Sequence, residues 1–301
     1  MSEKITHTAV MDDCFRLALA SGKLCPAFVE TMRGLWDFAR LGSGTRAGDR
    51  HSVQLLTSFR ERWPERRPEE RLEPKLAFVL GWLCHRAADR QMKPVFRQAE
   101  PDRTQKPSEC SVYHEAFLFR EIFCRDPERL YTAATLETDL GALPAAKILD
   151  TAAVREVFHT LMQQALIEIH TFSPDEDNIE TWLDGLFGLQ QDFYVDVERY
   201  AAAVAQPDPD KVRRFISEVN FYDREEPIIL TARALQRGET LASEAVCAAI
   251  GAGAQSHYAQ ALKMGCGYVL AASDFFEGRL SADELRERFD IGKAGWDGKS
   301  V

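Results

Sequence analysis

A histidine and an aspartate lie four residues apart in the stretch GWLCHRAADRQMKPVF, as His85 and Asp89. Residues at this spacing share one face of an α-helix, so the imidazole and the carboxylate would point in the same direction. The spacing alone is not diagnostic, because 7 histidines and 47 acidic residues in 301 positions produce about one such pair by chance. The chemistry of the pair therefore depends on the helix that carries it.

The helix expected over Pro74–Arg97 has one face on which residues recur at steps of four and three. Its members are Phe78, Trp82, His85, Asp89, Met92 and Phe96. Burial of an unpaired carboxylate costs roughly several kcal/mol, so Asp89 on this apolar face needs a partner, a cation or a proton. A hydrogen-bonded His–Asp pair at a helix crossing and a metal site both meet that need.

A second helix, in SECSVYHEAFLFREIFCRD, repeats the pattern. His114 and Glu121 interrupt an apolar row here, while Glu115 is expected to face solvent. One interpretation is that both long side chains reach water at the margin of the helix. Two helices that each direct an imidazole and a carboxylate inward are, however, typical of metal centres in helical bundles. The duplication therefore favours a metal site.

The glycine-rich segment ARLGSGTRAGDRH ends in Asp49, with His51 nearby. It matches neither GxGxxG nor the Walker spacing, so it does not predict a phosphate-binding loop. Two interpretations remain, a plain connection in which Asp49 caps the next helix and a loop that presents this carboxylate to a site.

Helical periodicity dominates the chain, and clean strand alternation is nearly absent. The expected helices are Thr8–Ala20, Pro26–Leu41, Pro74–Arg97, Cys110–Arg125, Ala152–Thr171, Glu176–Val204, Asp210–Asn220, Glu225–Arg237, Thr240–Gly251, Gln255–Phe276 and Ser281–Phe289. Connections rich in proline, glycine and aspartate separate them. The fold is therefore expected to be all-α, a single multi-helix bundle of about ten helices in one domain over residues 1–301.

Composition excludes several classes of protein. The net charge of −10, with no basic patch, argues against nucleic-acid binding. The 7 cysteines form no CxxC pair, so neither a disulfide framework nor a thiolate zinc site is expected. There is no signal-peptide pattern and no run of roughly 18 apolar residues, which predicts a cytoplasmic protein without stable membrane insertion.

Four motifs occur in an order that resembles the bacterial zinc-dependent phospholipase C family. They are KITHTAV, the loop ending in Gly48–Asp49, GWLCHRAAD and VYHEAFLFRE, so the likeness covers roughly residues 1–125. It implies an all-helical phosphodiesterase fold, one or more Zn²⁺ ions and a small-molecule or lipid phosphodiester substrate. By motif it implies the metal ligands His7, Asp49, His85, Asp89 and His114. It leaves residues 126–301 as a helical region of unassigned role.

Asp49 is also the expected catalytic carboxylate, which would bridge metal ions or accept a proton from the attacking water. Where the family has an acid four residues after the second histidine, this chain has Leu118, and Glu121 is the proposed substitute ligand. The alternative is a non-catalytic helical protein that keeps a structural metal site or a buried His/Asp network. A nucleotide phosphohydrolase of the HD type is disfavoured, because the chain has no His-Asp dipeptide.

Overall fold

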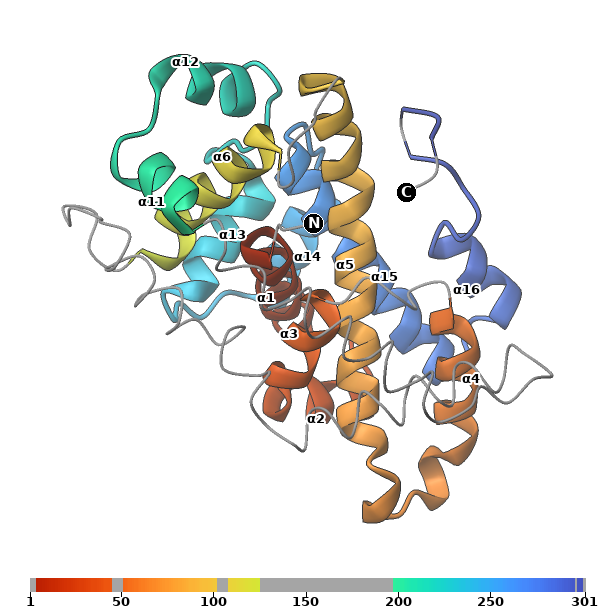
Figure 1. Ribbon diagram of the computed structural model, residues 1–301. Coiled ribbons are helices and arrows are strands. Elements are labelled where there is room, and N and C mark those ends of the chain that lie inside the picture. Colours follow the sequence, from red (N-terminus) through yellow and green to blue (C-terminus); the bar gives the residue numbers. More distant parts are fainter. Residues whose placement is uncertain (1–3, 45–50, 102–107, 125–196, 296, 300–301) are drawn as a thin grey trace.

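The computed structural model describes residues 4–44, 51–101, 108–124, 197–295 and 297–299 (Figure 1). Every regular element in these ranges is a helix, which confirms the all-α prediction. The described part of the chain contains twelve α-helices, more than the expected total of about ten.

The elements before the first long gap are the α-helices α1 Lys4–Ala20, α2 Pro26–Gly34, α3 Trp36–Gly44, α4 Ser52–Arg62, α5 Leu72–Ala99 and α6 Glu109–Leu118. Two short 3-10 turns, Trp63–Glu65 and Pro68–Glu70, connect α4 to α5, and a π-helical turn, Phe119–Phe123, follows α6. After the gap come α11 Val197–Ala205, α12 Pro209–Val212, a π-helical turn Arg213–Ser217, α13 Pro227–Gln236, α14 Ser243–Gly251, α15 His257–Phe276 and α16 Ala282–Arg288.

Helix α5 is the central element of the fold, as its apolar composition predicts (Figure 1). Helices α1, α3 and α15 pack along it, and nearly all of its side chains are buried. A helix that is covered on all sides must satisfy any polar group it carries through neighbouring helices. The surroundings of α5 therefore decide what His85 and Asp89 do.

Three differences from the expected helices affect the site. Helix α1 begins at Lys4 rather than Thr8, so His7 belongs to its first turn. The expected helix Pro26–Leu41 is two helices separated at Leu35. Helix α4 was not expected, because the apolar residues of SVQLLTSFRER are few. Of the other expected helices, Ala152–Thr171 and most of Glu176–Val204 lie outside the described residues.

Two glycines allow α3 and α5 to cross at very short distance. A Cβ atom on Gly42 of α3 would lie 2.1 Å from the carbonyl oxygen of Phe78, and one on Gly81 of α5 would lie 2.0 Å from that of Ala39. Only glycine permits backbones to approach this closely. The crossing brings Ser43, the residue after Gly42, next to the turn of α5 that carries His85.

Arginines of α5 hold the C-terminal segment against the bundle. Arg86 donates to the carbonyls of residues 289 and 290 at 2.8 and 2.7 Å, and Arg90 donates to those of residues 293 and 294 at 2.9 Å each. Arg97 forms an ion pair with Asp297. These three arginines therefore hold the C-terminal segment in place rather than facing solvent. None of the described helices combines the length and apolarity needed to cross a membrane.

The glycine crossing yields a stability prediction. We expect Gly81→Ala to lower the free energy of unfolding by roughly 1–3 kcal/mol or more, because the added methyl group overlaps backbone atoms of α3. The matched control is Gly267→Ala in α15, where nothing lies within 4 Å of the added atom. That change should stabilise the protein by about 0.5–1 kcal/mol through helix propensity. Chemical denaturation of both variants measures the difference, and equal stabilities would contradict a tight crossing.

Candidate metal centre

One imidazole from α1 and an imidazole and a carboxylate from α5 meet in the interior. The residues are His7, His85 and Asp89, and their potential ligand atoms all lie within 4.8 Å of one another. Within the described ranges they are the sole group of three or more such side chains at metal-binding distance. Their exposed fractions are 4%, 3% and 5%, so the group is almost closed to solvent.

The carbonyl oxygen of Ser43 determines which nitrogen of His85 faces Asp89. Nδ1 of His85 lies 2.8 Å from this oxygen, which can only accept, so Nδ1 carries the proton. In a neutral imidazole, Nε2 then has a lone pair. Nε2 lies 3.0 Å from Oδ2 of Asp89, so two electron-rich atoms face each other. A proton on Nε2 or a metal ion must lie between them.

His7 approaches the same carboxylate from the opposite helix. Its Nε2 lies 3.5 Å from Oδ1 of Asp89, so each carboxylate oxygen has its own imidazole. The rings of His7 and His85 are stacked, with centroids 4.3 Å apart and planes inclined by 16°. Stacking two imidazoles is unfavourable when both are charged, because the charges repel. Neutral imidazoles that share a metal ion avoid this repulsion.

Asp89 remains ionised despite its burial. Desolvation would raise the pKa of this carboxyl group, but a protonated His85, the nearby His7 and the Lys93 ammonium together hold it well below its usual range. The Lys93 ammonium forms an ion pair with Oδ2. A permanent carboxylate beside two imidazoles is a hard and borderline donor set that suits Zn²⁺.

The structure places His114 outside this group, contrary to expectation. Its Nε2 donates to the carbonyl of Phe215 at 2.8 Å, and its ring stacks on Phe221 with centroids 3.6 Å apart. Burial lowers the pKa of His114 to about 3, with His257 contributing, while the Phe215 contact opposes the shift. His114 is therefore a neutral core histidine in an aromatic pocket.

Glu121 and Glu115 have surroundings opposite to those expected. Glu121, the proposed substitute ligand, forms a two-pronged ion pair with Arg224 near the surface. Glu115, expected to face solvent, has no exposed surface and accepts hydrogen bonds from Ile5 and Thr6. Helical periodicity placed both residues on α6 and its extension but did not reveal which elements lie opposite.

The remaining expected ligand, Asp49, lies outside the described residues. Its assignment as a ligand and as the catalytic carboxylate stays a prediction.

Two contributors to the site were not predicted. Lys93 follows Asp89 by four residues, a spacing that indicates an ion pair on a helix. Ser43 acts through its backbone carbonyl, which leaves no side-chain signal in the sequence.

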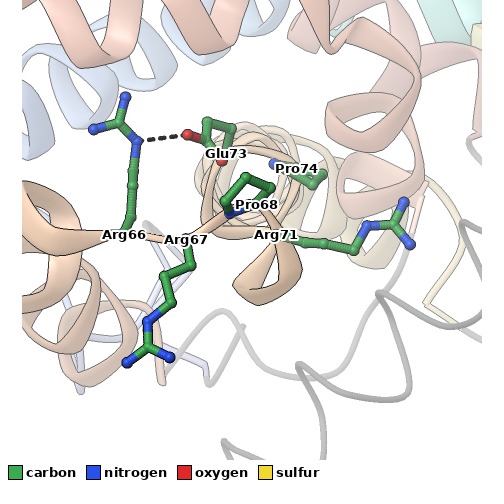
Figure 2. Close-up of a pocket in the computed structure, with 6 residues that line it drawn as sticks. All are labelled: Arg66, Arg67, Pro68, Arg71, Glu73 and Pro74. Carbon is green, nitrogen blue, oxygen red and sulfur yellow. Dashed lines mark hydrogen bonds and ion pairs between the residues drawn. The ribbon is translucent and has the colours of Figure 1, made fainter.

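A surface pocket of about 450 Å³ lies at the turn into α5, away from the metal centre (Figure 2). Its lining residues are Arg66, Arg67, Pro68, Arg71, Glu73 and Pro74. Figure 2 shows Arg66 paired with Glu73, while Arg67 and Arg71 point away from each other. Pro74 precedes His85 by 11 residues, about 16 Å along the helix axis. The pocket therefore does not give access to the three ligands.

The buried His114 yields a pH prediction. The unfolded chain binds a proton at this residue below pH 6.5, whereas the folded protein does not until about pH 3, so stability falls as pH decreases through this window. Between pH 7 and pH 5, the shifted pKa of His114 should lower the free energy of unfolding by about 2 kcal/mol. His114→Gln keeps a donor for the Phe215 carbonyl but cannot titrate. Urea unfolding at both pH values should show a correspondingly smaller loss in the variant, and identical losses would contradict the neutral state.

Comparison of the chain with protein-family models, curated proteins and solved structures finds no match. The likeness to zinc-dependent phospholipase C therefore rests on the four sequence motifs. Among the histidines and carboxylates that those motifs imply, the described residues bring together His7, His85 and Asp89.

Proposed function

We propose that His7, His85 and Asp89 bind a divalent metal ion, Zn²⁺, and that the protein is a metal-dependent phosphodiester hydrolase. One observation carries the metal site. The Ser43 carbonyl holds the ring proton of His85 on Nδ1, so the Nε2 lone pair faces the Asp89 carboxylate at 3.0 Å. A cation between these atoms satisfies both of them.

The donor set fits zinc in number and spacing. Two imidazole nitrogens and one carboxylate oxygen are a known three-ligand set for catalytic zinc, which keeps a fourth position for water or substrate. Ligand atoms around a tetrahedral zinc ion lie about 3.3 Å apart, given bond lengths of about 2.0–2.1 Å. Nε2 of His85 lies 3.0 Å from Oδ2 of Asp89 and Nε2 of His7 lies 3.5 Å from Oδ1, so each nitrogen has one carboxylate oxygen at about this separation.

The residues around the site suit an anionic substrate. When bound, zinc supplies a hydroxide nucleophile near neutral pH and neutralises phosphate charge. Lys93 lies about one turn after Asp89 on α5 and adds positive charge beside it. This local charge offsets the net charge of −10 that would otherwise repel a phosphodiester. Lys93 is 20% exposed, so its ammonium lies where the site approaches solvent.

The four sequence motifs support hydrolysis of a phosphodiester, in a small molecule or a lipid, as the reaction. Within this proposal the chain's own groups have distinct tasks. Ser43 and Asp89 orient His85, and Lys93 attracts and holds the phosphate. Asp49 remains the proposed proton acceptor for the attacking water.

A non-catalytic protein with a structural metal site is the second candidate. The observation that favours it is the engagement of His114 and Glu121 with other partners, which leaves three assigned ligands among the described residues. A structural site with these ligands would bind metal without turnover.

The test is zinc titration of the chelator-treated full-length protein by calorimetry, together with turnover of bis(4-nitrophenyl) phosphate. We expect about one or more zinc ions per chain, zinc-dependent hydrolysis, and loss of both in His85→Ala by more than the roughly 100-fold typical of an outer-shell change. His114→Gln is the matched control and should retain zinc binding and activity.

The possible outcomes separate the two candidates. Absence of zinc binding in the unsubstituted protein would refute the metal site. Stoichiometric zinc without hydrolysis would favour the structural role. Equal loss of zinc in His114→Gln and His85→Ala would return His114 to the ligand set.

A further inference from the structure

Glu115 of α6 is a fully buried carboxylate attached to another helix. Its Oε2 accepts a hydrogen bond from the backbone N–H of Ile5 at 2.8 Å. Its Oε1 accepts from the backbone N–H of Thr6 at 2.7 Å and from the Thr6 hydroxyl at 2.6 Å. Both oxygens are thus committed to the first turn of α1, and none of the side chain is exposed.

The first turn of α1 needs such an acceptor. The first N–H groups of a helix have no partner within it, and the helix dipole favours a negative charge at this end. Helix α1 has no acidic residue in its first turn. Glu115, from 109 or more positions away in the chain, supplies acceptors for two of these N–H groups. Its contacts lie on the residues immediately before His7.

The position of His7 depends on this turn. His7 directly follows Ile5 and Thr6, the two residues whose backbone N–H groups Glu115 holds. A metal ligand must be held to within about 0.5 Å of its productive position. The other two ligands lie in the middle of α5, where the helix is continuous on both sides. His7 is therefore the ligand whose placement needs outside support.

We propose that Glu115 is the positioning residue for His7, holding the first turn of α1 so that this imidazole joins His85 and Asp89. The role rests on the proposed metal site but adds a residue that does not touch the metal. Through Glu115, α6 contributes to the site by holding α1 in place. His114 and Glu121, from the same region of the chain, do not contribute to the site. Loss of the carboxylate should weaken zinc binding only by way of His7.

A double-mutant cycle tests this route, because it isolates the coupling between two residues. Glu115→Gln removes one acceptor without changing the side-chain shape, and we expect zinc affinity to fall by about 10–100-fold, as for other residues that orient ligands. In a His7→Ala background the same change should have little further effect. An equal loss in both backgrounds, or unchanged affinity in Glu115→Gln, would overturn the proposal.

Ser256→Ala is the matched control for lost helix capping. The Ser256 hydroxyl is buried and accepts from Ala259 at the start of α15, a helix that carries none of the three ligands. This variant should lose stability while its zinc affinity stays unchanged. A parallel fall in affinity would show that general destabilisation explains the effect.

A metal-free measurement separates this proposal from the proposed function. In the apo protein, stacking on His85, with centroids 4.3 Å apart, should give the imidazole NMR signals of His7 a ring-current shift. Glu115→Gln should abolish that shift and Ser256→Ala should not. Where Glu115→Gln does not fold, Thr6→Val, which removes only the hydroxyl contact, should give a smaller change in the same direction. An unchanged shift in the folded variant refutes positioning, whether or not zinc binds.

Discussion

The arrangement of the site depends on how the charge of Asp89 is accommodated in the interior of the bundle. Two imidazole nitrogens and the Lys93 ammonium face a carboxylate that is only 5% exposed. Nδ1 of His85 donates its proton to a hydrogen bond with the Ser43 carbonyl. The other ring nitrogen, Nε2, faces Asp89 and is therefore an acceptor in the neutral ring. An extra proton on Nε2 of His85 or a bound cation must compensate, and a second proton on His7 would place two like charges in stacked rings.

Backbone contacts far apart in the sequence place these groups. The glycine crossing lets α3 present its last turn to α5, so the Ser43 carbonyl reaches His85. The Glu115 carboxylate holds the first turn of α1, so His7 reaches the same spot. Three helices thereby hold the proposed ligands in place without an ion, as a preorganised site requires. Neither contact involves an atom that would touch the metal.

Local periodicity was sufficient to predict the all-α class and the shared face of His85 and Asp89 on α5, since the spacing of these two residues is a property of one helix. It failed where an element from elsewhere in the chain decides the outcome. The helix carrying His7 was expected to begin at Thr8, whereas it already includes Lys4, and Glu115 of a distant helix accepts from its Ile5 and Thr6 N–H groups. His114 was expected to be a ligand from its place on an apolar face and from the motif resemblance. Its actual partner, the carbonyl of Phe215, lies 101 residues away and has no side-chain signature.

The most direct measurement is anomalous diffraction at the zinc absorption edge from crystals grown with stoichiometric zinc. We predict a peak within about 2.0–2.2 Å of Nε2 of His7, Nε2 of His85 and one oxygen of Asp89. The central claim would be contradicted by crystals without a peak at these atoms, in which His85 and Asp89 keep their 3.0 Å separation as a plain hydrogen-bonded pair.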